Sequence, residues 1–208
     1  MEMKERIQQK ATDLFRKYGI RSITMDEIAA QLAVSKKTIY QFFADKDELV
    51  DAVIGNLIHY AQDCCTNDRK GAKDAVEEIF MAMEFVKEMF SNMNPVLLFD
   101  LERAHPNAFK KFQEHKAKYL LKLIRDNLER GIREELYRVD LNIDVLSKLR
   151  LENMMISFNQ EIFPAGKYNL ADTQQIIIEH YVFGIASLKG YKQIVKYKEV
   201  KSPKSKPV

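Results

Sequence analysis

Polar side chains that could bind nucleic acid are concentrated between residues 24 and 46. Lysine ammonium groups pair with phosphates, and hydroxyl and amide groups hydrogen-bond to phosphates and to base edges. The stretch 31–44 carries two lysines and no acidic residue, so its local charge is positive. We therefore predict contacts with double-stranded DNA from the following side chains: Thr24, Ser35, Lys36, Lys37, Thr38, Tyr40, Gln41 and Lys46.

Two short helices with a tight connection would position these side chains. Thr24 and Glu27 form a capping box at the start of one helix, and Ser35 can cap the next. Two helices of about two turns each, separated by a few residues, are the sequence form of a helix-turn-helix. A helix that enters a major groove about 12 Å wide must be short and must present polar groups outward. Ile39 and Phe43 are placed to point inward, which leaves the polar side chains facing out.

Lys46 stands at the start of a fourth helix, next to a second capping box formed by Asp45 and Glu48. A lysine is unfavourable at a helix N-terminus, where the backbone N–H groups already carry partial positive charge. The same N–H groups bind anions, so a lysine becomes favourable there if a DNA phosphate is present. We therefore expect Lys46 and the hydroxyl of Thr24 to contact phosphates.

Net charge gives no support for DNA binding. The formal charge is +3, but residues 189–208 hold seven lysines and one glutamate, so the rest of the chain is net acidic. Residues 1–50 hold nine Lys and Arg against eight Asp and Glu. The prediction of a DNA interface therefore depends on where particular charges lie.

Apolar side chains recur at helical spacing along almost the whole chain, and no alternation typical of a strand is present. We predict an all-α fold of about nine helices. An N-terminal three-helix DNA-binding domain with the helix-turn-helix occupies residues 1–50. A C-terminal helical domain occupies residues 51–197, for which the family resemblance described below implies ligand binding and dimerisation, and residues 198–208 form a disordered basic tail. The expected helices cover 3–18, 24–32, 35–43, 45–60, 72–91, 106–131, 142–163 and 172–197, with a loop at 67–71 and proline-started helices after Asn94 and His105.

The run from Ile23 to Leu49 resembles the DNA-binding domain of the TetR family of bacterial repressors. The resemblance covers about residues 5–55, a quarter of the chain. Its motifs are a threonine before the second helix, Val-Ser-Lys ahead of Thr-Ile-Tyr, an aromatic residue three positions after Tyr40, and a lysine ahead of Glu-Leu.

The resemblance implies a homodimer of nine or ten helices per chain that binds a near-palindromic operator. In such proteins a small ligand in the C-terminal body loosens DNA binding. By the family pattern Thr24, Tyr40 and Lys46 touch phosphates, and the base-facing residues are Lys36, Lys37, Thr38 and Gln41.

Two positions depart from the family pattern. Ala33 stands where glycine is frequent, and Phe42 stands where a polar residue such as histidine is common. Phe42 could contact a DNA sugar, a thymine methyl group or the neighbouring helix.

The body offers candidates for an effector cavity and for a dimer surface. Aromatic and methionine side chains could line a cavity, although ordinary core packing is the alternative for each of them: Tyr60, Phe80, Met83, Phe90, Phe99, Phe112 and Met155. The last two helices carry more apolar surface than one stripe, which favours packing against a partner chain. The dimer candidates are Leu146, Phe158, Ile177, Tyr181, Ile185 and Leu188.

Other classes of protein find little support. No nucleophile–base pairing, metal-ligand spacing or glycine-rich phosphate loop is present, so we expect neither an enzyme nor a cofactor or metal. The four histidines share no metal-like spacing, and the adjacent Cys64 and Cys65 are expected to be reduced thiols. No run approaches the roughly 20 apolar residues of a membrane span, and no signal sequence opens the chain, which favours the cytoplasm. The alternative to a DNA-binding regulator is a helical interaction module whose three-helix head docks on protein.

Overall fold

The computed structural model describes residues 2–201, and it confirms an all-α fold with an N-terminal helix-turn-helix. Within these residues one isolated antiparallel bridge, between Tyr137 and Ala186, is the only β-type pairing. The helices are α1 (Met3–Tyr18), α2 (Met25–Leu32), α3 (Lys36–Tyr40), α4 (Lys46–Gly71), α5 (Ala75–Phe90), α6 (Val96–Ala104), α7 (Pro106–Glu114), the π-helical segment η1 (His115–Leu120), α8 (Leu121–Arg133), α9 (Ile143–Ile156), α10 (Leu170–Ile185) and α11 (Leu188–Lys201).

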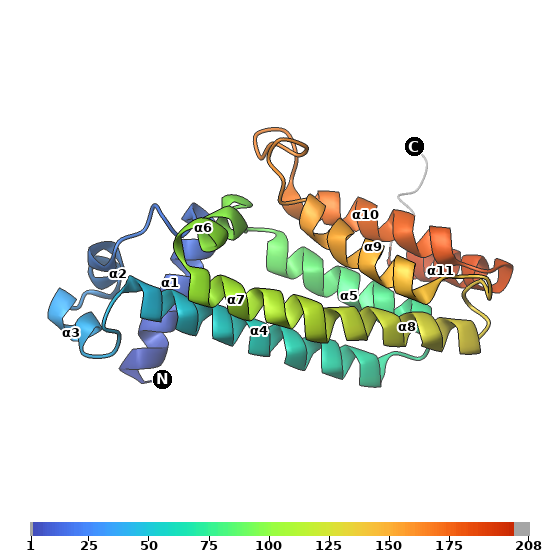
Figure 1. The fold of residues 1–208 in the computed structure, drawn as a ribbon, viewed down its shortest axis with the longest axis horizontal. Coiled ribbons are helices and arrows are strands. Elements are labelled where there is room, and N and C mark those ends of the chain that lie inside the picture. The colour runs from blue at the N-terminus through green and yellow to red at the C-terminus, as the bar shows by residue number, and fades with distance from the viewer. Residues whose placement is uncertain (1, 202–208) are drawn as a thin grey trace.

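Helices α1 to α3 form a small head at one end of an elongated molecule, and α9 to α11 lie toward the other end (Figure 1). Helix α4 runs along most of the length between them, beside the rod formed by α7, η1 and α8. The described part of the chain therefore has a head and a body that share one long helix.

Two apolar cores hold these parts together. The first contains side chains of α1 to α4 and also Leu97, Leu101 and Ala108 of α6 and α7. The second joins α5, α8, α10 and α11 around residues such as Leu128 and Ile178. Because α6 contributes side chains to the close-packed core of the head, a displacement of α6 must also shift side chains in the head. The domain boundary at residue 50 stays a prediction.

Several boundaries predicted from the sequence are wrong. The expected loop at 67–71 is the last part of α4, because Ala72 N–H still donates to the carbonyl of Asp68 (2.8 Å). The expected helix 142–163 ends at Ile156, and turns follow it. The expected helix 172–197 is two helices, with extended backbone at Ala186 between them (ψ 142°).

The break at Ala186 has a packing cause. Ser187 N–H donates to the carbonyl of Leu136, and the backbone at Gly190 lies so close that a Cβ there would sit 1.8 Å from the Leu136 oxygen. The chain leaves the helix to make this contact, and only glycine fits at position 190.

The predicted disordered tail at 198–208 is wrong for its first part. Helix α11 continues to Lys201, and Lys198 forms an ion pair with Glu179 of α10. The remainder of that predicted tail, residues 202–208, lies outside the described residues. Among the described helices, none is both long enough and apolar enough to span a membrane.

Candidate nucleic-acid interface and internal cavity

The helix-turn-helix is held by caps at both helix starts. Glu27 N–H donates to the Thr24 hydroxyl oxygen (3.2 Å), and the Glu27 carboxylate accepts from Thr24 N–H (2.6 Å). The carboxylate also accepts from the Thr24 hydroxyl (2.9 Å), and the two bonds that it accepts lower the pKa of Glu27 because they favour its ionised form. Thr38 N–H donates to the Ser35 hydroxyl oxygen (3.1 Å) at the start of α3. The capping residues predicted from the sequence are therefore confirmed as caps.

Ala33 forms the turn between α2 and α3 in a left-handed conformation, with φ 54°. Its N–H closes α2 by donating toward the carbonyls of Ala29 and Ala30. This conformation favours glycine, which explains why glycine is frequent at the position, and alanine adopts it here at a cost of about 1 kcal/mol.

Helix α3 presents a polar face to solvent and packs an apolar face on the head. Ile39 and Phe43 are fully buried, as predicted, whereas Lys37 and Tyr40 are exposed. Phe42 is half-buried against the core of the head, so packing accounts for at least part of its surface. The exposed residues on and beside α3 are Ser35, Lys36, Lys37, Tyr40 and Gln41, with Thr38 partly exposed.

Lys36 is paired but accessible. Its ammonium lies 2.8 Å from a carboxylate oxygen of Asp26, and both side chains are more than half exposed. The hydrogen bond to Asp26 is the main reason why the pKa of Lys36 is raised. An exposed ion pair of this kind contributes little to stability, so a phosphate could replace Asp26 as the partner.

Lys46 is placed differently from the other lysines of the site. Its ammonium donates to the carbonyl oxygen of Ile20 (2.7 Å), and burial lowers its pKa. The position of Lys46 in the sequence predicts a phosphate partner for this ammonium, but here it is turned into the head. The same buried carbonyl also accepts from Ile23 N–H (3.3 Å), so Lys46 supplies its second hydrogen bond.

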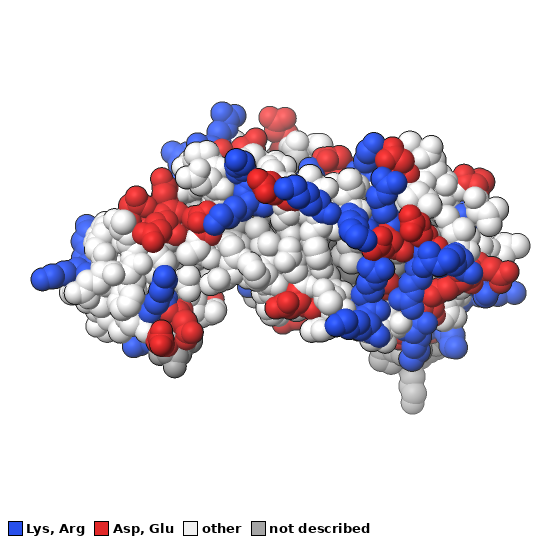
Figure 2. All heavy atoms as spheres, turned by 60° about the horizontal axis from the view of Figure 1, so that its bottom comes forward, with Lys and Arg blue, Asp and Glu red and all other residues white. Residues whose placement is uncertain are grey.

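On the face that Figure 2 shows, basic charge is not concentrated over the head. Lys and Arg side chains gather, mixed with Asp and Glu, over the end of the molecule away from α1 to α3, and only scattered basic side chains project from the head (Figure 2). The candidate DNA interface is therefore defined by the exposed face of α3 and not by a broad basic surface.

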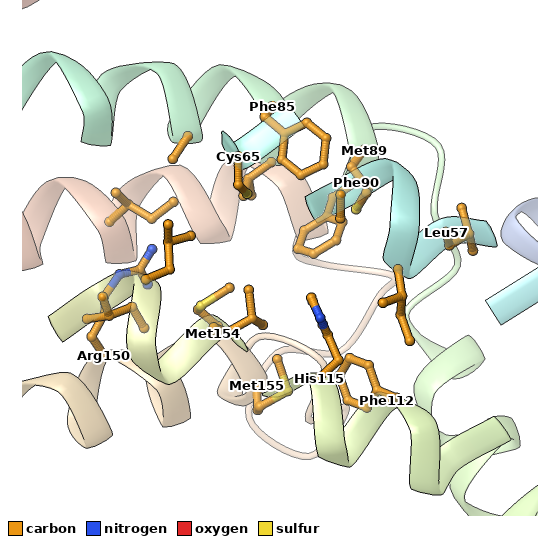
Figure 3. Close-up of a pocket in the computed structure, with 18 of the residues that line it drawn as sticks. Leu57, Cys65, Phe85, Met89, Phe90, Phe112, His115, Arg150, Met154 and Met155 are labelled. Carbon is orange, nitrogen blue, oxygen red and sulfur yellow. The ribbon is translucent and has the colours of Figure 1, made fainter. Parts of the chain in front are cut away.

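The body contains a partly open cavity of about 260 Å³ lined by residues of every helix from α4 to α10, η1 included (Figure 3). Its walls are mostly aliphatic, aromatic and thioether side chains. Three of the seven predicted effector residues line it: Phe90, Phe112 and Met155. Phe80 and Met83 are buried in the second core outside the lining, and Tyr60 and Phe99 are exposed at the surface. Those four predictions are wrong for this cavity, because helical spacing alone does not tell which face of a helix meets a void.

Polar groups on the cavity wall were largely missed from the sequence. Arg150 of α9 lines the cavity and is 8% exposed, and His115 lines the opposite part of the wall. Burial lowers the pKa of His115, whose Nδ1 lies 3.1 Å from the Gln62 amide nitrogen. Arg150 follows Leu146 and precedes Met154 at a spacing of four residues, so it falls on an apolar helix face. That position was the signal that could have identified it.

Cys65 is not a reactive centre. Both cysteines are free, and burial raises the pKa of Cys65 to about 11, which keeps that cavity-lining thiol protonated at neutral pH. No group of three or more His, Cys, Asp or Glu in the described residues is arranged to hold a metal ion.

Direct bonds connect the body to the head. Asp100 of α6 accepts from Arg21 N–H (2.9 Å), and His105 Nδ1 lies 2.6 Å from a carboxylate oxygen of Asp47 in α4. Asp100 and His105 are both buried. Leu97 and Leu101 of the same α6 segment line the cavity, so the cavity wall includes an element that is bonded to the head.

The predicted dimer residues are divided between core and surface. Tyr181 and Ile185 are buried in the core of the single chain, which leaves them little surface for a partner. Phe158 is half-buried and packs edge-on against Phe90 in the cavity wall. Leu188 is exposed, and Leu146 and Ile177 are partly exposed. Exposed apolar side chains outside the predicted set lie on α9 and α10: Val145, Leu149, Ile156 and Ile176.

Comparison with known proteins places the head in a family. Residues 7–53 match the model described as bacterial regulatory proteins, tetR family. The uncharacterised HTH-type transcriptional regulator YvaF of Bacillus subtilis is 29% identical over 111 residues, which cover 51% of this chain and 56% of that protein. The aligned region spans about half the length of the curated relatives that the chain matches first.

Solved structures share the fold over a longer range. A TetR-family regulator from Agrobacterium tumefaciens superposes with a TM-score of 0.74 at 15% identity, over 88% of this chain and 97% of that one. FadR of Bacillus subtilis, solved in complex with stearoyl-CoA, superposes with a TM-score of 0.64 at 19% identity, over 87% and 98% of the two chains. The matched helix-turn-helix, its capped geometry and the shared fold lead to one conclusion: residues 7–53 form a DNA-binding head of the tetR family of bacterial regulatory proteins, and the chain as a whole has the fold of solved regulators of that family.

Proposed function

We propose that the chain is a transcriptional repressor that binds a near-palindromic DNA operator as a homodimer and is released by a small-molecule effector. The observation that carries the proposal is α3, a short capped helix whose exposed face consists of lysines, hydroxyl groups and Tyr40. Side chains of these types bond to phosphates and to base edges in a major groove. The proposed partner is chromosomal DNA, so we assign the activity to the cytoplasm.

A dimer is needed because one short helix reads only a few base pairs. Two recognition helices about 34–36 Å apart would meet successive major grooves on one face of the duplex. The exposed apolar residues of α9 and α10 support a surface at which two copies pair as a four-helix bundle.

The cavity supports effector control. It is lined by helices of the body, and α6 connects its wall to the head through the Asp100 and His105 contacts. A ligand that prefers one arrangement of α6 would change the position of the head, and by linkage DNA would change the affinity for the ligand by the same factor.

Fluorescence anisotropy with labelled DNA from beside the gene tests DNA binding. We expect the wild-type protein to bind with an affinity that falls steeply with salt. Replacing Lys37→Ala together with Tyr40→Ala should weaken binding at least about tenfold, because the variant can make neither the proposed base contact of Lys37 nor the proposed phosphate contact of Tyr40. The matched control is Lys192→Ala with Tyr191→Ala, an exposed pair on α11.

Two results would contradict the proposal. One is binding that survives the double substitution in α3, and the other is binding without salt dependence. If the head instead captures a protein and ignores DNA, the alternative of a helical interaction module is correct.

A further inference from the structure

Arg150 is a buried cation without an acidic partner. Its side chain is 8% exposed, and its Nη1 atom is buried without a hydrogen bond. No ion pair to Arg150 is present within the described residues. Its guanidinium carbon lies 5.4 Å from the centre of the Tyr181 ring. Burial lowers the pKa of Arg150 to about 10, so the side chain remains charged at neutral pH.

A buried charge without a partner destabilises the folded state, so its presence needs a physical explanation. Buried charges in proteins are normally paired, and an orphaned buried donor calls for a ligand, an ion or a functional explanation. A leucine or methionine would fill the same space without that cost. The arginine is therefore more easily explained by what enters the cavity than by the stability of the fold.

The carboxylate, amide and imidazole groups on the cavity wall already have partners. Glu78 is paired with Arg130 (2.9 Å), and the Asn127 amide donates to the Ala75 carbonyl (3.0 Å). His115 is bonded to Gln62, and Asp68 is also engaged. Of the charged groups that line the cavity, Arg150 is the one whose donor is left unsatisfied within the described residues.

The rest of the wall is suited to hydrocarbon. Figure 3 shows Arg150 beside Met154 at one end of the labelled lining residues, with Phe112 and Leu57 at the other end. A dry cavity of about 150 Å³ accommodates benzene, so the 260 Å³ found here corresponds to roughly ten non-hydrogen atoms.

From these observations we propose that the cavity takes an apolar molecule with one terminal carboxylate, and that the carboxylate pairs with Arg150. The planar guanidinium can bind both oxygens of a carboxylate in parallel, which a neutral alcohol or amide cannot reproduce. This inference rests on the proposed function in one respect, since it assigns a ligand class to the proposed effector cavity.

Direct binding of two matched probes tests the proposal. Octanoate and octan-1-ol have the same chain length and differ in the charge of the head. Binding would be measured by calorimetry and by NMR of the methionine methyl groups, among which those of Met154 and Met155 report on the cavity. We expect the wild-type protein to bind octanoate about 10–100-fold more tightly than octan-1-ol, as for a charge-assisted hydrogen bond.

Substitutions at Arg150 separate the contribution of its charge to octanoate binding from the contribution of its shape. Arg150→Met should remove the preference for octanoate and leave octan-1-ol binding within about twofold, whereas Arg150→Lys should restore part of the preference. Arg133→Met, an exposed arginine on α8, is the matched control and should behave as wild type. The comparison of the two probes on wild-type protein stands even if a variant fails to fold.

The outcomes distinguish this inference from the proposed function. Equal affinity for both probes, or an unchanged preference in Arg150→Met, overturns the carboxylate assignment and leaves an apolar effector site standing. Selective octanoate binding that does not weaken DNA binding supports the ligand class and overturns effector release. If neither probe perturbs the cavity methyl groups, the proposed effector site and its ligand class both fail.

Discussion

Arg150 is buried without an acidic partner, and a charge in that position weakens the folded state. We expect Arg150→Met to raise the free energy of unfolding by about 1–3 kcal/mol, because methionine fills the site without an unpaired charge. Urea denaturation at neutral pH measures the change, with Arg133→Met expected to stay within about 0.5 kcal/mol of wild type. Destabilisation by Arg150→Met would mean that the arginine has a structural role.

His115 gives a prediction for acid stability. Burial lowers its pKa below the ordinary value of 6.5, so the unfolded chain binds a proton more readily than the folded chain does. The stability that comes from the neutral imidazole is therefore present above pH 6.5 and is lost as the pH falls below it. We expect His115→Gln to lose less stability than wild type between about pH 7 and pH 5, measured by thermal unfolding. An equal loss in both proteins would refute the assignment.

Residue-level prediction from the sequence worked where a side chain's role depends on local geometry. Thr24 and Ser35 cap their helices because a capping box involves residues only three positions apart. It failed where the role depends on distant packing. Arg150 meets Tyr181 and the cavity only after α9 and α10 come together, and Tyr60 faces solvent although its spacing suits a core position.

At the level of elements, the start of α2 can be tested by changing its cap. Thr24→Val keeps the shape but removes the oxygen that accepts from Glu27 N–H, and we expect a loss of about 1 kcal/mol in unfolding free energy. Thr24→Ser keeps the oxygen and should stay close to wild type. Chemical denaturation of both variants checks the prediction, and equal stabilities would show that the cap contributes nothing.

The sequence predicts which segments are helical better than it predicts the residues at which the helices end. The apolar period of α1, α2 and α5 is clear in the sequence, because each helix packs one face on a core. The ends of α9 and α10 are set by contacts the period does not contain, such as the close approach of Gly190 to Leu136. The predicted helix 106–131 also contains a π-helical segment at His115–Leu120, which adds residues without changing the apolar pattern visibly.

At the level of the whole molecule, the proposed dimer predicts a sharp change in mass. Leu149→Glu places a charge among the exposed apolar residues of α9 and should convert a dimer into a folded monomer. Sedimentation velocity gives the mass, and circular dichroism checks the fold. Val139→Glu, an exposed apolar position outside α9 and α10, is the control. A dimer that survives Leu149→Glu would place the interface elsewhere.

Coupling between body and head is a second property of the whole molecule. His105→Asn removes the imidazole that contacts Asp47 and leaves the cavity lining intact. We expect octanoate to bind as in wild type, while its effect on operator affinity shrinks by about threefold or more. Anisotropy titrations with and without octanoate give the ratio, and Lys118→Met in an exposed pair on the surface is the control. An unchanged ratio would mean that the coupling runs through other contacts.

Helix α4 belongs both to the core of the head and to the wall of the cavity, so it can act as a lever between them. Its first turns are buried in the head at Leu49 and Val53, and further along it lines the cavity at Ala61 and Cys65. A straight helix of 26 residues is about 39 Å long. Tilting such a lever by about 5° moves its far end by about 3.4 Å, which is the rise of one base pair. A ligand that shifts the cavity wall only slightly could thus put a recognition helix out of step with its groove.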